Sequence, residues 1–472
     1  MPVGKADDAE GATEEDFMAW KASLFTMFRR NLGLEEIEIK YTPTFTVVKD
    51  PSLDIIDIHH GEPSHPSDNM KTAAACSPIR ALTVQKSKEI FNSAERNCLR
   101  MDLDLSEHPD LHYKTGDHLA VWPMNPEAEV QVLLKALGRF NERDVPITIK
   151  SLDPTVKVKI QTPTTTSALV RYYLEICAPV SCETILNLAY FAPTAEAKTY
   201  LLSLGQDKDV YTDFLTRNYL AMGRILSLAS PGSSWTALPV SYLIEYLPHL
   251  RPRYYSISST SVISPRQPSI AALVAKTPLL NAPTQSILGL TSNYLLFLSN
   301  TLPTSNTHTG EPPYQPPGPS ERLEGGKIFA HIRKSKFKLP SLASRPLVMI
   351  ATGTGLAPFM ALLAERKKLM GIGRPVGEMI LFFGCRNPAE DYIYRAELEE
   401  MEKLFGGKLR LVTAFSRVSR ESRVYTQDRI VERSKTVLGL VEEGANICIC
   451  GRANIAKDVE RAISEAMIAR KG

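Results

Sequence analysis

Short apolar runs alternate with amphipathic stretches over the last third of the chain. Runs typical of buried strands occupy 346–352, 379–384, 409–415 and 447–450. Each is followed by apolar residues at helical spacing, at 358–370, 389–404, 427–442 and 453–469. Strands and helices that alternate in this way predict βαβ units around a parallel sheet. Residues 341–472 are therefore expected to form an open, doubly wound α/β domain.

The middle of the chain has a different pattern. Residues 99–105 alternate apolar and polar positions, as a half-buried strand does. Further extended runs lie at 117–122, 250–275 and 327–338. These runs predict an antiparallel β-barrel domain in two parts, 76–125 and 249–340. Between the parts, 126–248 is expected to be a helical insertion, with helical spacing at 127–137, 167–176, 182–191 and 242–247.

Three other stretches complete the predicted organisation. The first 20 or so residues are expected to be a linker, within a segment 1–75 that leads into the barrel domain. Residues 299–326 are rich in Pro, Gly and Ser, which predicts a surface loop. Residues 347–364 carry no charge and are long enough for a membrane span. Gly353, Gly355 and Pro358 interrupt that run, so a strand, a turn and a buried helix are favoured.

Composition narrows the class of protein. The 472 residues are 43% apolar and 23% charged, which excludes a disordered chain. A net charge of +3 gives no global sign of a nucleic-acid or membrane-surface binder. Seven cysteines without a CxxC pair argue against a disulfide framework and favour a cytosolic environment. The acidic N-terminus lacks the apolar core of a signal peptide or anchor, and no metal site is predicted.

The strongest local motif is RYYSISS at 253–259, on a predicted strand. Arg253 could clamp a pyrophosphate with its planar guanidinium. Tyr254 or Tyr255 could stack on a flat heterocycle, and the Ser256 hydroxyl could reach a ring nitrogen. The alternative is an ordinary strand with β-favouring aromatic residues.

A second motif lies at 287–297, where a helix is expected to begin. Gly289 permits a close backbone approach, and Leu290 leads into the hydroxyls of Thr291 and Ser292. Free amides at a helix start bind phosphate well. A simple Ser/Thr helix cap explains the same residues.

A third motif, ATGTGLAPF at 351–359, follows a strand and opens a helix. This is the context of a dinucleotide-binding loop, here with Gly353, Thr354 and Gly355, and with Pro358 where a third glycine is usual. No acidic residue follows at the spacing typical of an NAD site. A basic cluster instead favours NADP, since arginines suit a 2′-phosphate, although a solvated basic face would look the same. The cluster comprises Ser416, Arg417, Arg420, Arg423, Tyr425 and Gln427.

Cys450 closes the strand 446–450. Ligands of open α/β sheets gather at the carboxyl ends of strands, so its thiol could lie beside a nicotinamide. A buried apolar cysteine is the alternative.

Together these segments resemble flavoproteins of the ferredoxin–NADP reductase type. Within that group they resemble the diflavin branch, the NADPH–hemoprotein (cytochrome P-450) reductases. The resemblance runs from about residue 14 to 458 and includes YKTGDHLAVWP at 113–123 and FFGCRNPAEDYIYRAEL at 382–398. It implies a barrel that binds FAD, a helical connecting domain inserted in it, and a C-terminal NADP domain.

The resemblance also implies residue roles. Arg253, Tyr255 and Ser256 are expected to contact FAD, and Gly289, Thr291 and Ser292 to hold its pyrophosphate. Ser256 and Cys450 match members of the family's hydride-transfer group. The residues expected to face NADP are Gly353, Thr354 and Arg386, with Ser416, Arg417, Arg423, Tyr425 and Gln427 around the adenosine phosphate.

The implied activity is hydride transfer from NADPH to FAD, followed in the intact family by electron transfer through FMN to haem proteins. The family's membrane anchor, FMN domain and flavin-covering C-terminal strand are expected to be missing here. We therefore expect reduction of small acceptors such as ferricyanide, with a haem protein or a separate FMN domain as partner. The family is anchored at the cytoplasmic side of the endoplasmic reticulum membrane and is monomeric by default. The resemblance therefore implies a monomer on the cytoplasmic side. The alternatives are a sulfite reductase flavoprotein or a nucleotide-binding remnant without turnover.

Overall fold

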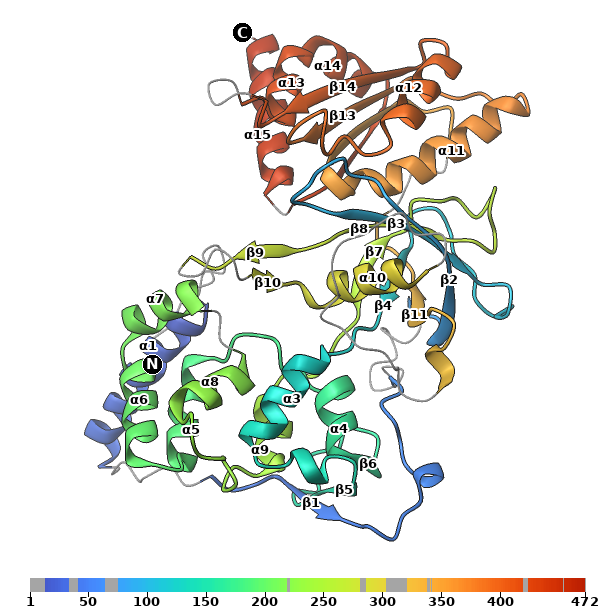
Figure 1. Ribbon diagram of the computed structural model, residues 1–472. Coiled ribbons are helices and arrows are strands. Elements are labelled where there is room, and N and C mark those ends of the chain that lie inside the picture. Colours follow the sequence, from blue (N-terminus) through green and yellow to red (C-terminus); the bar gives the residue numbers. More distant parts are fainter. Residues whose placement is uncertain are drawn as a thin grey trace. The chain divides into compact units, whose positions relative to one another are not determined.

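The chain forms two compact units, divided after Thr44. The computed structural model describes residues 13–33, 41–63, 75–218, 221–280, 286–302, 321–337, 340, 342–418, 423–452 and 454–471. In the first unit, helix α1 (Thr13–Leu32) occupies part of the segment expected to be a linker. No helix was predicted in this segment. The second unit contains every other element, and Figure 1 shows its order along the chain.

A parallel sheet forms the C-terminal part of the second unit. In the described residues it has four strands in the order β14-β13-β12-β15. The strands are β12 (Leu347–Thr352), β13 (Met379–Cys385), β14 (Leu409–Phe415) and β15 (Asn446–Cys450). Register is continuous, with Leu347 opposite both Met379 and Asn446. The predicted doubly wound α/β architecture is confirmed.

Helices cover both faces of this sheet (Figure 1). They are α11 (Ala357–Gly371), α12 (Arg395–Leu404), α13 (Thr426–Glu432), α14 (Ser434–Glu442) and α15 (Ile455–Lys471). Alternate residues of β12 pack into two different hydrophobic cores, one on each face of the sheet, because successive side chains of a strand point to opposite faces. Met349 packs in a cluster with residues of α11 and α12, whereas Val348 and Ile350 pack with residues of α13, α14 and α15.

Two helices differ from the sequence pattern. The predicted helix 389–404 begins only at Arg395, because Tyr394 has a left-handed backbone conformation with φ of 54°. Asp391, just before it, accepts hydrogen bonds from the backbone of Arg386 and Asn387, which holds this segment as a turn. The predicted helix 427–442 is two helices, which meet at Arg433 with φ of −106° and ψ of 19°.

An antiparallel barrel precedes the parallel sheet. Among the described residues, its six strands run in the order β7-β4-β11-β2-β3-β8. They are β2 (Arg80–Glu89), β3 (Cys98–Asp104), β4 (His118–Val121), β7 (Arg253–Ser256), β8 (Ser269–Leu273) and β11 (Lys327–Arg333). A bridge between Ile257 and Ile270 joins the two edge strands, so the sheet closes on itself. The predicted barrel, split in sequence, is confirmed.

Helix α10 (Leu290–Thr301) packs into the barrel core through Tyr294, Leu295 and Leu298. A short antiparallel pair, β9 (Lys276–Pro278) and β10 (Ser286–Leu288), leads into it. Most of the predicted loop 299–326 lies outside the described residues. The described part includes the end of α10 and a short 3₁₀ turn, η6 (Glu321–Leu323).

The segment between the barrel parts is mainly helical. Its helices and helical turns are α3 (Glu127–Ala136), η3 (Phe140–Glu142), α4 (Thr166–Ala168), η4 (Leu169–Tyr173), α5 (Cys182–Leu188), η5 (Ala189–Phe191), α6 (Ala195–Gln206), α7 (Lys208–Asn218), α8 (Met222–Ala229) and α9 (Val240–Tyr246). The predicted helix 167–176 is only two short turns. Sequence reasoning missed a small sheet of β1 (Phe45–Lys49), β5 (Pro146–Ser151) and β6 (Thr164–Thr165), with η2 (Ile55–Asp57) after β1.

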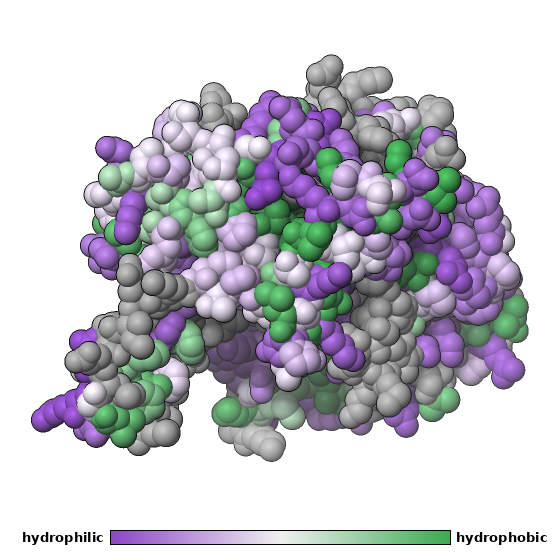
Figure 2. All heavy atoms as spheres, turned by 90° about the horizontal axis from the view of Figure 1, so that it is seen from below, coloured by the Kyte–Doolittle hydropathy of each residue, from purple (hydrophilic) through white to green (hydrophobic). Residues whose placement is uncertain are grey.

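Polar and apolar side chains are interspersed over the face of the molecule shown in Figure 2. Within the described ranges, no helix combines the length and apolar composition needed to cross a membrane. The uncharged run 347–364 is instead divided between β12, the turn η7 (Gly353–Leu356) and α11.

Candidate functional site

A cleft of about 1320 Å³ is lined by residues of the barrel and of the parallel sheet. The barrel contributes Tyr254, Tyr255 and Ser256 from β7. The α/β domain contributes the carboxyl ends of its strands and the loops that follow them. Most sequence-predicted residues meet here, namely Gly353, Thr354, Arg386, Ser416, Arg417, Arg423, Tyr425, Gln427 and Cys450. Arg420 lies outside the described residues.

The loop after β12 has the geometry of a dinucleotide cradle. Gly353 has φ of +53°, a conformation that glycine adopts without steric cost, and a Cβ there would meet open space. At Gly355, a Cβ would lie 2.2 Å from the Cys450 carbonyl oxygen. The loop and the end of β15 therefore touch backbone to backbone, which brings the thiol of Cys450 and the glycine loop to the same cleft.

Positive charge dominates the α/β side of the cleft. Arg386, Arg417, Arg423 and Arg452 line it. The pKa of Arg386 is lowered from its ordinary value, first by burial and then by Arg96 and Arg417 close by. Arginines held this close repel one another until an anion joins them, so the cleft is suited to the phosphates of a dinucleotide.

The β7 residues present aromatic and hydroxyl groups to the same cleft. β7 pairs with β4, and Ser256 lies opposite His118. The guanidinium carbon of Arg333 lies 4.4 Å from the centre of the Tyr254 ring, which holds this ring by a cation–π contact. Burial raises the pKa of Tyr255, so its hydroxyl stays protonated and its ring presents a neutral surface.

Five predicted residues do not line the cleft. Arg253 instead pairs with Glu175, with 3.1 Å between Nη2 and Oε2. Gly289, Leu290, Thr291 and Ser292 lie at the start of α10, and Ser292 Oγ is already bound to Ala275 N at 3.0 Å and Gly289 O at 3.2 Å. In the described part of the chain, buried Thr291 Oγ1 has no hydrogen-bond partner.

The structure adds residues that sequence reasoning missed. Phe91 and Arg96 come from the barrel, and Asp391, Arg452 and Asp458 from the α/β domain. Asp391 belongs to the segment 382–398 that was already singled out, so its position after a strand end was a usable signal. No local pattern marks Phe91 or Arg96, which enter the cleft only through tertiary packing.

The site fits two cofactors by its own chemistry. The open loop at Gly353 and the surrounding arginines suit a nicotinamide dinucleotide phosphate. The aromatic rings of Tyr254 and Tyr255 and the hydroxyl of Ser256 suit a flavin on the barrel side of the cleft. An antiparallel barrel facing a doubly wound domain across such a cleft defines a flavin-dependent oxidoreductase that uses a nicotinamide coenzyme.

Comparison with known proteins identifies the family. A model described as "FAD binding domain" matches residues 77–294, and one described as "Oxidoreductase NAD-binding domain" matches 349–461. The chain is 40% identical over 479 residues to an NADPH–cytochrome P450 reductase of Aspergillus terreus, covering 100% of this chain and 68% of the relative. For the reductase of Candida tropicalis the identity is 35% over 474 residues, covering 98% and 69%.

The chain belongs to the NADPH–cytochrome P450 reductase family. It is an oxidoreductase of the flavoprotein class that binds FAD and NADPH and transfers electrons from NADPH to FAD. The predicted family, activity and cofactors are thereby confirmed.

Proposed function

We propose that the two sides of the cleft align NADPH with FAD for direct hydride transfer. When both are bound, the nicotinamide supplies a hydride and the flavin ring accepts its two electrons. The observation that carries the proposal is that Tyr255 and Ser256 of the barrel line one cleft with the glycine loop and Cys450 of the α/β domain. This arrangement supports a barrel domain for FAD at 76–125 and 249–340, with the connecting insertion 126–248 and the NADP domain 341–472.

Each side chain has a distinct proposed role. The Ser256 hydroxyl donates a hydrogen bond near the reacting ring nitrogen, and Tyr254 and Tyr255 provide aromatic surface for the ring. Arg253 and the residues from Gly289 to Ser292 hold the flavin phosphates, which requires Arg253 to exchange Glu175 for a phosphate. Gly353, Thr354 and Arg386 hold the nicotinamide dinucleotide. Its adenosine phosphate is bound by Ser416, Arg417, Arg423, Tyr425 and Gln427.

The electrons then pass to a haem protein or through a separate FMN domain. The names of the relatives support a cytochrome P450 as acceptor. We propose that the protein acts as a monomer on the cytoplasmic side of the endoplasmic reticulum, as the family resemblance implies. Small acceptors such as ferricyanide should take electrons from the flavin directly.

Replacing Ser256 by alanine tests the proposed alignment. Removal of one donor aimed at the reacting centre should slow flavin reduction by about 100-fold, while FAD stays bound. The measurement is stopped-flow bleaching of the flavin band at saturating NADPH, in chain reconstituted with FAD. Ser261→Ala, a serine outside the cleft lining, is the matched control and should match the unaltered chain within about twofold. Equal rates for the two variants would refute the role of Ser256.

The thiol of Cys450 should act without ionising. Burial raises its pKa above the ordinary value of 9.0, so the thiol stays protonated throughout the neutral range. The rate of flavin reduction should therefore show no step from Cys450 between about pH 6 and pH 8. The pH profiles of the unaltered chain and of Cys450→Ser should have the same shape, with the variant slower throughout. A step near neutral pH that vanishes in Cys450→Ser would show a thiolate mechanism instead.

A further inference from the structure

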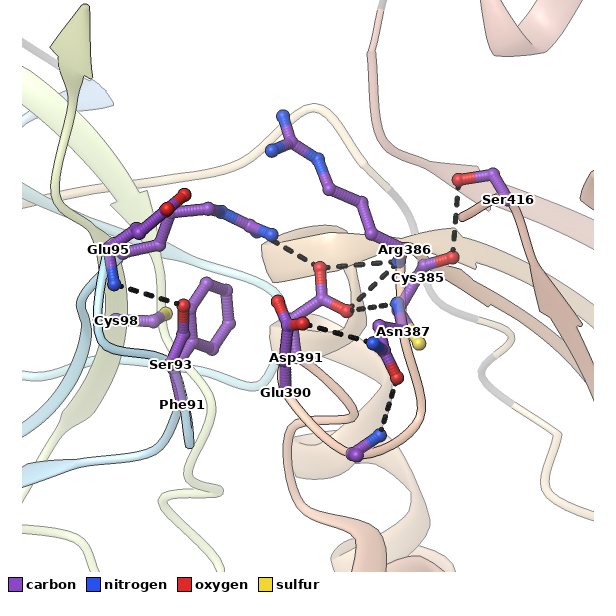
Figure 3. A network of polar contacts seen from close by, with 12 residues as sticks. Phe91, Ser93, Glu95, Cys98, Cys385, Arg386, Asn387, Glu390, Asp391 and Ser416 are labelled. Atoms are coloured by element: carbon purple, nitrogen blue, oxygen red, sulfur yellow. Dashed lines mark hydrogen bonds and ion pairs between the residues drawn. The ribbon is translucent and has the colours of Figure 1, made fainter. Parts of the chain in front are cut away.

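A single buried carboxylate organises the turn that carries Arg386. Asp391 Oδ1 accepts hydrogen bonds from the backbone N–H groups of Arg386 at 3.0 Å and Asn387 at 2.8 Å, and Oδ2 accepts from Arg386 N at 3.2 Å (Figure 3). Only 6% of the Asp391 side chain is exposed. Because a buried charged acceptor binds backbone donors strongly, the turn is held in one conformation.

The same carboxylate connects the α/β domain to the barrel. Arg96, in the connection between β2 and β3, donates from Nη2 to Asp391 Oδ2 at 3.0 Å. Arg96 is itself held over the ring of Phe91, with its guanidinium carbon 4.8 Å from the ring centre. A backbone hydrogen bond of 2.7 Å from Asn92 N to Glu390 O ties the two segments a second time.

An acidic residue is unexpected at this place. The cleft has to accept a coenzyme with several negative phosphate charges, and Asp391 lines it beside Arg386. By charge alone, Asp391 would weaken coenzyme binding, and its removal would strengthen it. Its contacts indicate the opposite contribution, because they fix the turn that presents Arg386.

We propose that Asp391 is a positioning residue, which with Arg96 sets the place of the Arg386 turn relative to the flavin side of the cleft. This inference rests on the function proposed above and deepens it. Asp391 need not touch the coenzyme: it orients the backbone that carries Arg386, and Arg96 transmits that orientation to the barrel. The pair thus couples coenzyme binding in one domain to hydride transfer at the other.

The variant Asp391→Asn separates positioning from charge. Asparagine has similar volume, but its neutral oxygen is a weaker acceptor and its NH₂ group faces donors. The positioning role predicts that NADP⁺ binds about tenfold more weakly, since hydrogen bonds to a charged group are being lost. The charge effect alone predicts tighter binding. Calorimetric titration of the FAD-loaded full chain with NADP⁺ distinguishes the two, and unchanged or tighter binding overturns the proposal.

Glu390→Gln is the matched control. Glu390 is the neighbour of Asp391 outside the cleft lining, and its side chain accepts a hydrogen bond from the Asn387 side chain at 3.0 Å. Its neutralisation should leave NADP⁺ affinity equal or slightly higher, because a nearby negative charge is removed while Asp391 still binds the backbone of the turn. A loss of affinity as large as that of Asp391→Asn would overturn the specific role of Asp391.

Arg96→Gln covers the case in which Asp391→Asn fails to fold. It leaves the turn capped and the Asn92–Glu390 backbone hydrogen bond in place, but it removes the ion pair between the turn and the barrel. We expect flavin reduction at saturating NADPH to slow about tenfold, as misplaced reactants do. The affinity for 2′,5′-ADP, which occupies only the adenosine side, should stay within about twofold, and Arg96→Lys should restore most of the rate. An unchanged rate in Arg96→Gln overturns the proposal, whereas absence of flavin reduction in the unaltered chain would refute the proposed function instead.

Discussion

Replacing Gly355 by alanine should abolish NADPH-driven reduction of the flavin. The new Cβ would lie 2.2 Å from Cys450 O and 2.7 Å from Cys450 C, both of them backbone atoms that cannot rotate away. The loop and the end of β15 would have to separate, which displaces Gly353, Thr354 and Cys450 together. A displacement near 1 Å costs about 100-fold in rate, so a loss of at least that size is expected. Overpacking should also lower the free energy of unfolding by about 1–3 kcal/mol.

Stopped-flow reduction and thermal unfolding measure the two effects of Gly355→Ala. The matched control is Gly371→Ala at the end of α11, where a Cβ would meet no atom within 4 Å. That variant should keep the rate and the melting temperature of the unaltered chain. Full activity in Gly355→Ala would show that the close approach of loop and strand is not required for hydride transfer.

Replacing Arg417 and Arg423 by alanine should remove the preference for NADPH over NADH. Both line the cleft beside Ser416 and Tyr425, and a hydrogen bond to a charged group contributes about 1.5–3 kcal/mol. Each substitution should therefore lower kcat/KM for NADPH by about 10-fold to 100-fold, and the double variant by about 100-fold to 10,000-fold. The same constant for NADH, which lacks the 2′-phosphate, should change little.

The readout for this pair is the ratio of kcat/KM for the two coenzymes, measured with ferricyanide as acceptor. Arg410→Ala serves as the control, because Arg410 is a β14 arginine outside the cleft lining, 3.6 Å from Glu378. Its ratio should equal that of the unaltered chain. If kcat/KM of the double variant fell as much with NADH as with NADPH, the two arginines would bind the part that both coenzymes share rather than the 2′-phosphate.

Local patterns predicted most of the architecture. The strands of the parallel sheet were placed to within a residue or so, since β12 and β13 are apolar runs buried on both faces and β14 and β15 are short, largely apolar runs. The sheet of β1, β5 and β6 was missed because its strands are short and its pairing is distant, with Phe45 opposite Ser151. The late start of α12 was missed as well. Asp391 accepts a hydrogen bond from the backbone of Arg386, and this tertiary contact holds the start of 389–404 as a turn although its apolar residues have helical spacing.

The candidate site was predictable where it rests on contiguous motifs. The RYYS motif lies on a strand, and the GTG motif lies between a strand and a helix. In each motif the functional groups are neighbours in the sequence, so their chemistry could be inferred from their spacing. The GTG loop lines the cleft, as do Tyr254, Tyr255 and Ser256 of the first motif, whereas Arg253 does not. The segment from Gly289 to Ser292 was expected beside them, yet it lies at the start of α10 outside the cleft lining.

By itself the sequence determined the family, the split barrel with its helical insertion, the α/β domain and the coenzyme chemistry. The architecture follows from periodicity, and the family and its coenzymes follow from a resemblance that short motifs carry; both depend on neighbours along the chain. The tertiary structure alone decided which charges share the cleft. Arg96 and Asp391 are 295 positions apart and meet only because the connection between β2 and β3 lies against the 386–391 turn. Contacts of that kind are set by the closure of the barrel and the docking of two cores, and no local pattern encodes them.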